Sequence, residues 1–352
     1  MEQPIIPNHL DAEALYQLGI AYILDENGHK KPDADFASAI PYLEQASVLG
    51  HATAQASLAS CYVQGLGTDV DYDKAYRWFS AAAEQGHAIS QYNLGMCYSR
   101  GEGIEQSDEL ALSWYRKSAE RGDAAGQSML ALHYATGLVV EQDYEQAVYW
   151  ARQSAEQCYP IAQNLLGLRY FYGEGVEQDY EQAAYWYRQS AEQGDSSGQY
   201  HLAACYEEGK GVEKDLQQAA YWYRQSAEQG DSSGQYHLAA CYEEGKGVEK
   251  DLQQASYWYR QSAEQGDVYA QYSLGYLYQY GEGIEHDLEQ AAYWFRQAAE
   301  QGDSDAQYSL GSCYELGEGV ERDIEQARYW YRQSAEQGDE GAKEALESLL
   351  EE

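Results

Sequence analysis

Several kinds of segment are missing from this chain of 352 residues. No apolar run approaches the roughly 18 residues that a membrane-spanning helix needs, so we expect no such helix. The opening residues 1–7 hold neither a basic stretch nor an apolar core, which is unlike a secretory signal. We therefore expect a cytoplasmic protein, with export by a route that needs no signal left open.

Positive charge and cysteine are also scarce. The chain has 22 Lys and Arg against 59 Asp and Glu, a formal net charge of −37. This charge repels phosphate backbones and anionic headgroups, so we expect neither nucleic acid nor a membrane surface as a partner. It favours a protein or peptide partner that is basic or neutral. Six cysteines are few for this length, which indicates a reducing compartment.

The sequence does contain a period of 36 residues. Every tryptophan lies on it, a leucine column and a glycine column share it, and Cys158 stands at the one break in the glycine column. A fixed spacing of this kind is the mark of a repeat array, which grows by stacking instead of dividing into separate cores. The tryptophan column is Trp78, Trp114, Trp150, Trp186, Trp222, Trp258, Trp294 and Trp330.

The period divides the chain into nine repeats. The first, residues 11–50, carries four extra residues that we place around the loop 25–28. Residues 1–10 form a lead, and 339–352 begin like another first helix and are expected to cap the array. Repeats 195–230 and 231–266 differ only by Ala220 against Ser256. The eight later repeats are 51–86, 87–122, 123–158, 159–194, 195–230, 231–266, 267–302 and 303–338.

Repeat 159–194 shows the expected local structure. An apolar stripe at helical spacing predicts a first helix that ends near Gly173, because glycine tolerates the left-handed conformation after a helix. Asp179 with Gln182 three residues later predicts the start of a second helix. We therefore expect an all-α fold, a superhelical solenoid of two antiparallel helices per repeat, with each tryptophan buried. The two stripes are Ala162, Leu166 and Tyr170, then Ala183, Trp186, Tyr187 and Ala191.

The repeat pattern resembles the Sel1-like repeat, a relative of the tetratricopeptide repeat. It reads Ala-x-x-x-Leu-Gly-x-x-Tyr-x-x-Gly-x-Gly-Val, then Asp, then Ala-x-x-Trp-Tyr-x-x-Ser-Ala-Glu-Gln-Gly, over about residues 11–338. The resemblance implies a right-handed superhelix with the first helices on its concave side. It also implies adaptor or scaffold work, and a bacterial protein, some relatives of which are exported or are encoded beside toxins.

One cysteine-rich, secreted subgroup of these proteins pairs two cysteines in each repeat and has been linked to penicillin binding. This chain departs from that subgroup, because each repeat offers one thiol in a shared column. Neighbouring thiols are then about one repeat apart, beyond the reach of a disulfide. The column consists of Cys61, Cys97, Cys205, Cys241 and Cys313.

The candidates for catalysis or metal binding do not converge. His133 stands in the cysteine column, but a metal needs ligands that meet at one point, which an offset of one repeat prevents. Loop carboxylates such as Glu174 and Glu177 are expected to form a solvated acidic edge. The arginines from Arg116 to Arg332 precede a glutamate by four residues and are expected to form surface pairs with it. We therefore predict no catalytic residue, no metal and no cofactor.

The columns that vary lie on one face of the first helix. On the concave side they predict a contiguous apolar strip in the third to fifth repeats, and exposed apolar surface of this kind marks partner sites. The alternative is that tight curvature buries these side chains against one another. The predicted partner-binding residues are Met96, Met129, Leu132, Leu165, Leu168, Tyr172, His201, His237, Tyr276 and Tyr280.

Three functions follow from this sequence. The first is a monomeric, non-enzymatic adaptor that holds a protein or peptide in its groove. The second is an immunity-type or effector-type protein that neutralises or engages a basic partner, for which an acidic surface speeds capture. The third is a β-lactam-binding hydrolase, suggested only by the cysteine-rich relatives.

Overall fold

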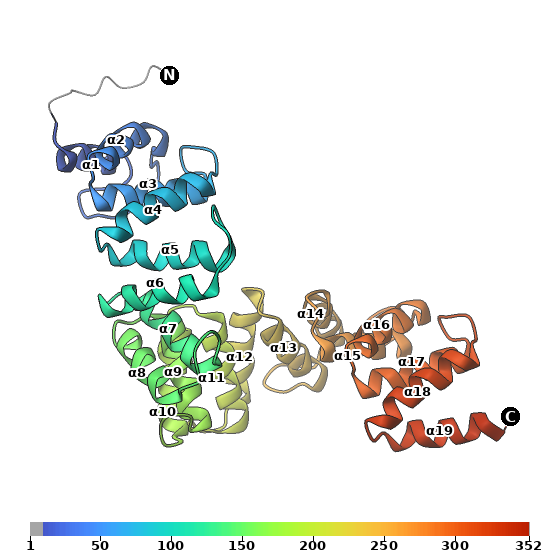
Figure 1. Ribbon diagram of the computed structural model, residues 1–352. Coiled ribbons are helices and arrows are strands. Elements are labelled where there is room, and N and C mark those ends of the chain that lie inside the picture. The colour runs from blue at the N-terminus through green and yellow to red at the C-terminus, as the bar shows by residue number, and fades with distance from the viewer. Residues whose placement is uncertain (1–9, 352) are drawn as a thin grey trace. The chain divides into compact units, whose positions relative to one another are not determined.

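The structure is a computed structural model that describes residues 10–351, without the side chains of 350 and 351. Residues 1–9, most of the predicted lead, lie outside the described residues. The described chain contains nineteen α-helices and one isolated bridge between Leu24 and Lys30, with no β-strand between residues 10 and 351. Within residues 10–178, and again within residues 179–351, successive helices stack in chain order (Figure 1). The all-α repeat solenoid predicted from the sequence is confirmed.

Each repeat supplies a first and a second helix. The first helices are α1 (Ala12–Ile20), α3 (Ala52–Gln64), α5 (Ala88–Arg100), α7 (Ala124–Thr136), α9 (Pro160–Tyr172), α11 (Ser196–Glu208), α13 (Ser232–Glu244), α15 (Val268–Tyr280) and α17 (Ser304–Leu316). The second helices are α2 (Phe36–Val48), α4 (Tyr72–Glu84), α6 (Asp108–Glu120), α8 (Tyr144–Ala155), α10 (Tyr180–Glu192), α12 (Leu216–Glu228), α14 (Leu252–Glu264), α16 (Leu288–Glu300) and α18 (Ile324–Glu336). A last helix, α19 (Glu340–Glu351), follows them.

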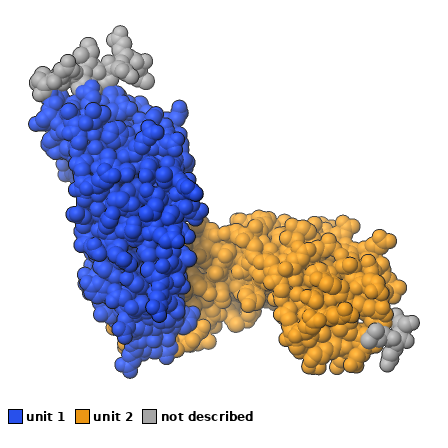
Figure 2. Space-filling view, viewed as in Figure 1, with its two compact units in different colours: residues 1–178 blue, residues 179–352 orange. Residues whose placement is uncertain are grey.

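The chain folds into two compact units, residues 1–178 and residues 179–352 (Figure 2). Unit 1 contains α1 to α9, and unit 2 contains α10 to α19. Within unit 1, α5 approaches α7 and α7 approaches α9, and within unit 2, α11 approaches α13. First helices thus meet across repeat boundaries, which places their variable side chains next to one another inside each unit.

The helix ends follow the residues that the sequence placed there. The carboxylate of Asp179 accepts a hydrogen bond of 3.0 Å from the backbone N–H of Gln182 and so caps α10. Gly173 ends α9 in the left-handed conformation with a φ of 70°. The longer first repeat turns at Gly28, where Asp25 accepts from the N–H groups of Asn27 and His29. Both ends of each hairpin are therefore set locally.

The core differs from the prediction at the tryptophan column. Within the described residues only Trp294 is buried, and the other seven tryptophans are half-buried. The fully buried aromatic ring belongs to the next residue, such as Tyr187 or Tyr223, because one step along a helix turns the side chain by about 100°. Trp258 instead packs at the boundary between the cores of successive repeats. The expectation of buried tryptophans was therefore wrong in seven cases.

The arginine column also differs from the prediction. Five of these arginines donate to the hydroxyl of a tyrosine eighteen residues later, in the first helix of the next repeat. None of the ion pairs between residues 10 and 351 joins an arginine of this column to the glutamate four residues on. The arginines thus connect neighbouring repeats. The pairs are Arg152–Tyr170, Arg188–Tyr206, Arg224–Tyr242, Arg260–Tyr278 and Arg296–Tyr314.

A column of buried glutamines makes a second connection. The side chain of Gln235 donates at 3.2 Å to the carbonyl of Ala227, in the second helix of the preceding repeat. Its carbonyl oxygen accepts at 2.8 Å from Gln265, at the end of its own repeat. The same bond across the repeat boundary recurs at eight glutamines: Gln55, Gln91, Gln127, Gln163, Gln199, Gln235, Gln271 and Gln307.

Candidate partner-binding surface

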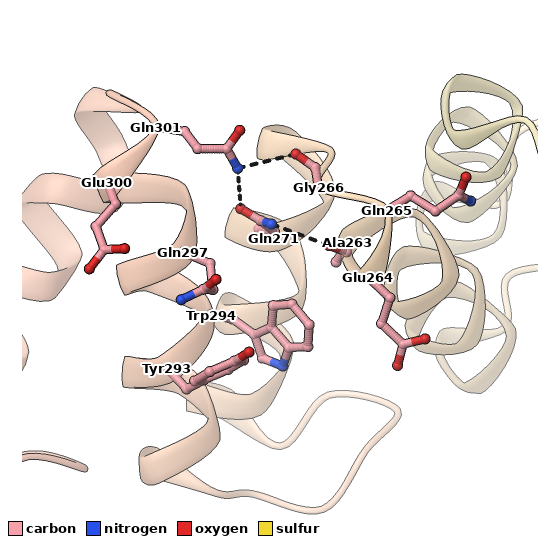
Figure 3. A pocket seen from close by; sticks show the side chains of 10 residues that line it. All are labelled: Ala263, Glu264, Gln265, Gly266, Gln271, Tyr293, Trp294, Gln297, Glu300 and Gln301. Carbon is pink, nitrogen blue, oxygen red and sulfur yellow. Dashed lines mark hydrogen bonds between the residues drawn. The ribbon is translucent and has the colours of Figure 1, made fainter. Parts of the chain in front are cut away.

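One cavity is lined by residues of the repeat columns. It measures about 530 Å³ and lies between the ends of α14 and α16 in unit 2, with Tyr293 and Trp294 at one side (Figure 3). Its polar edge is the glutamine connection, in which Gln301 donates to Gln271 at 2.8 Å and to the carbonyl of Gly266 at 3.1 Å. Gln337 makes the equivalent bonds one repeat later. Because its lining residues come from repeated columns and its polar edge is formed by bonds between repeats, this cavity is part of the repeat scaffold.

The predicted strip in unit 1 lies on three first helices that approach one another, α5, α7 and α9. Two of its side chains are clearly open to solvent, Leu132 at 37% exposure and Tyr172 at 61%. The other four, Met96, Met129, Leu165 and Leu168, are half-buried. The strip is therefore apolar surface that is exposed at two positions and half-buried at the other four.

Met96 also takes part in packing. The hydroxyl of Tyr115 on α6 donates to its sulfur at 3.2 Å. Met96 further lines a cavity of about 240 Å³ between α3 and α5, together with Tyr92 and Arg100. Met96 therefore has a packing role in addition to its place in the strip, and the ring of Tyr172 likewise contacts that of Phe171, with centroids 5.1 Å apart.

The other four predicted residues lie in unit 2. His201 stacks on the buried Tyr187 with ring centroids 4.9 Å apart, and His237 stacks on Tyr223 at 5.0 Å. Burial lowers the pKa of both imidazoles, so both are neutral at neutral pH. Tyr276 and Tyr280 are exposed on α15, with ring centroids 4.5 Å apart.

The cysteines fit a packing role. All six are free, and five of them are buried. Burial raises the pKa of Cys97 to about 11 and that of Cys205 to about 12, so these thiols stay protonated and are poor nucleophiles. The paired cysteines of the penicillin-binding subgroup therefore have no counterpart here. No cluster of His, Cys, Asp and Glu that could hold a metal occurs in the part of the chain that the structure describes.

Three buried tyrosines on second helices each donate a hydrogen bond to a glutamate on the first helix of the same repeat: Tyr223 to Glu207, Tyr259 to Glu243 and Tyr331 to Glu315. The sequence analysis did not single out these pairs, whose distances are 2.7 Å at Tyr223 and 2.6 Å at Tyr259. Burial and the neighbouring carboxylate raise the pKa of both phenols. In each case the tyrosine stands sixteen residues after a glutamate, but Tyr187 follows Phe171 at the same spacing, so the sequence carries only a weak signal for these pairs.

The turn of repeat 123–158 carries a second feature that the sequence analysis missed. Val139 adopts a φ of 68° at a position where the other seven 36-residue repeats have glycine. Val139 and the neighbouring Leu138 are both exposed. The same repeat contains Cys158, which stands in the glycine column with a φ of 63°. The repeat in the middle of the apolar strip thus has two non-glycine residues at positions where the backbone has a positive φ.

Comparison with known proteins agrees with this architecture. The model of the Sel1 repeat family matches nine consecutive segments, residues 12–51, 52–87, 88–123, 124–157, 160–195, 196–231, 232–267, 268–303 and 304–339. Among curated proteins, none matches the chain.

Two solved structures are similar over nearly the whole chain. The protective antigen c5321 of uropathogenic Escherichia coli is 36% identical, with a TM-score of 0.58 over 97% of this chain and 80% of that one. A Sel1 repeat protein from Oxalobacter formigenes is 28% identical, with a TM-score of 0.62 over 98% of this chain and 97% of that one. Both are bacterial proteins built from repeats of this type.

Proposed function

Because this chain belongs to the Sel1 repeat family, we propose that it is a non-catalytic adaptor that binds a protein or peptide along its first helices. The observation that carries the proposal is the partly exposed apolar strip of unit 1, Met96, Met129, Leu132, Leu165, Leu168 and Tyr172. The columns around it that recur from repeat to repeat, such as the glutamine column, are already occupied by bonds between repeats. The strip residues vary, and Leu132 and Tyr172 remain open to solvent. Exposed apolar side chains on neighbouring helices suit a protein partner.

The expected setting of this adaptor is the cytoplasm, as a monomer. Within residues 10–351, no helix has the length and apolar character that crossing a membrane requires. The five buried thiols agree with a reducing compartment. Size-exclusion chromatography with light scattering tests the monomeric state.

Affinity capture from the native cell tests the adaptor proposal. We compare the wild-type protein with the double variant Leu132→Ser and Tyr172→Ser, whose side chains are exposed enough to be replaced without opening the core. The matched control is Tyr185→Ser with Tyr221→Ser, two tyrosines of second helices that are each 51% exposed. We expect partners seen by mass spectrometry to be lost only with the first variant, while circular dichroism stays unchanged. Equal capture by both variants would contradict the placement of the site.

A second candidate is an immunity-type or effector-type protein that engages a basic partner, and the net charge of −37 favours it. Opposite charges steer association, so the association rate with such a partner should fall steeply as salt is raised. Stopped-flow measurements from about 50 to about 500 mM salt on a partner found by capture distinguish the two candidates. A rate that does not respond to salt indicates that the apolar strip, and not the charge, governs capture.

A further inference from the structure

A cup of aromatic rings opens on the first helices of unit 2. Its cavity of about 340 Å³ falls within the size range of small-molecule sites. Residues of α11 and α13, together with Tyr269 of α15 and Asp267, the capping residue of that helix, line it. We call these six residues the tyrosine cup: Tyr200, Ser233, Tyr236, His237, Asp267 and Tyr269.

The rings of the tyrosine cup surround the cavity at different angles. The centroids of Tyr236 and Tyr269 lie 6.0 Å apart with 43° between the ring planes. Those of Tyr200 and His237 lie 5.4 Å apart with 50° between the planes. Tyr269 is 64% exposed, which is far more than packing requires of a tyrosine. The arrangement therefore offers ring surfaces to a molecule entering from solvent.

The charge at the tyrosine cup is negative. Asp267 is the one full charge among the six residues, because burial lowers the pKa of His237 and leaves its imidazole neutral. The N-terminus of α15 contributes a partial positive charge of about half an elementary charge. The full charge of Asp267 outweighs it, and Glu207 and Glu208 also act on His237. Aromatic faces add to this preference, because a ring quadrupole attracts cations.

The cup exists at one place in the array because two columns change there. Repeats 195–230 and 231–266 are nearly identical, yet the position of Tyr269 is Ser233 one repeat earlier and Ser197 two repeats earlier. The position of Tyr200 is likewise Asn164 one repeat earlier. Three tyrosines and the histidine therefore come together only around α13, and the repeat before it lacks two of the three rings.

We propose that the tyrosine cup binds a guanidinium cation. A guanidinium group is planar, stacks on aromatic faces and forms paired hydrogen bonds with a carboxylate such as Asp267. The source is either an arginine side chain of a protein partner or a free arginine-like molecule. The first source rests on the adaptor function proposed above, whereas binding of the cation itself does not.

Titration calorimetry of the full chain with N-acetyl-arginine amide tests the proposal. N-acetyl-citrulline amide has nearly the same shape without the charge, and we expect it to bind at least about tenfold more weakly. Free arginine separates the two sources: tighter binding of the blocked amide indicates a peptide side chain, and tighter binding of free arginine indicates the free molecule. Equal binding of arginine and citrulline amides, or no binding of either, overturns the proposal.

Two variants and a control assign the binding to the tyrosine cup. Tyr269→Ser restores the residue of the preceding repeat, so its fold is already represented in the chain, and we expect about tenfold weaker binding. Asp267→Asn keeps a capping residue on α15 but removes the charge, with the same expected loss. Asp231→Asn makes the same change at the cap of α13, one repeat earlier, and should leave binding unchanged.

Unchanged binding in Tyr269→Ser and Asp267→Asn would overturn the assignment even if the amide binds elsewhere. Because the adaptor proposal is tested on unit 1 through Leu132 and Tyr172, the two can fail separately. Loss of capture with the unit 1 variant and no guanidinium binding would leave the adaptor and remove the cup. Guanidinium binding together with unchanged capture by the unit 1 variant would leave the cup and remove the adaptor.

Discussion

Arg224 illustrates how one residue can be assigned the wrong neighbour from sequence spacing. The glutamate four residues later is on the same helix and was the expected partner, but a surface pair of this kind contributes only a few tenths of a kcal/mol. The guanidinium instead donates at 2.6 Å to the hydroxyl of Tyr242 in the next repeat and lies over its ring. A half-buried donor with an aromatic contact outweighs an exposed ion pair.

Val139 yields a prediction at the residue scale. A left-handed conformation costs a non-glycine residue about 1–2 kcal/mol, and glycine in its place loses about 0.5–1 kcal/mol through the entropy of the unfolded chain. We therefore expect Val139→Gly to raise the free energy of unfolding by roughly 0.5–1 kcal/mol, measured by urea denaturation. Such a gain would show that the left-handed backbone of Val139 destabilises this repeat, whereas glycine relieves that strain in the other 36-residue repeats.

The reverse substitution provides the control for Val139. At Gly175 an added Cβ would lie 2.2 Å from the backbone oxygen of Tyr144, so Gly175→Val must displace the backbone. We expect it to lower the free energy of unfolding by more than about 2 kcal/mol. If Val139→Gly destabilised the protein, Val139 would be making contacts worth more than its strain.

At the scale of the helix, buried polar side chains fix how one repeat sits on the next. Apolar stripes of alanine and leucine can slide or rotate against one another at small cost, because burial does not depend on direction. The glutamine column removes this freedom, since a buried amide must meet its carbonyl partner. Gln235 is 4% exposed and bonds to both the preceding repeat and its own.

Replacing Gln235 with leucine tests this role. The change removes two hydrogen bonds, although the Ala227 carbonyl still accepts from the N–H of Gly230 and the Gln265 amide still donates to the carbonyl of Gln261. At about 0.5–1.5 kcal/mol for each bond, we expect a loss of about 1–3 kcal/mol in the free energy of unfolding. Gln265→Ala removes only the exposed partner and should cost about 0.5–1.5 kcal/mol. Chemical denaturation measures both, and an equal effect of the two variants would show that the buried bond to Ala227 contributes nothing.

At the scale of the whole molecule, stability should be close to a sum over repeats and their interfaces. Residues 231–266 repeat the sequence of 195–230 except at Ser256. Deleting them joins α12 to α15, and α12 has the same sequence as α14, the present neighbour of α15, except at that one position. We expect the shortened chain to fold, with the denaturant m-value reduced by roughly a tenth.

Guanidinium denaturation followed by circular dichroism checks the deletion. Helical signal per residue should stay constant, and the free energy of unfolding should fall by the contribution of one repeat and one interface. A control that deletes residues 231–248, half a repeat, should unfold the neighbouring helices, because α12 would lose the pairing that its sequence requires. Equal behaviour of the two deletions would contradict a modular array.

The local structure and the period could be predicted because they depend on neighbours in the sequence. Asp179 and Gly173 act on the backbone within a few residues, and the 36-residue columns show which faces are buried whatever the partner. The variable face was found in the same way, and Leu132 and Tyr172 are exposed as a partner site requires. The sequence by itself therefore determined the fold, the repeat count and which face of the first helices varies.

Only the tertiary structure decided which side chains meet across repeats. The sequence gives no measure of rotation between neighbouring hairpins, so Trp186 and Tyr187 could not be ranked by burial, and Arg188 was assigned to its own helix. The same rotation brings Tyr200, Tyr236 and Tyr269 around one cavity with Asp267, although they are spread over three repeats. Contacts between repeats depend on packing of whole helices, and the tyrosine cup became visible only when that packing was known.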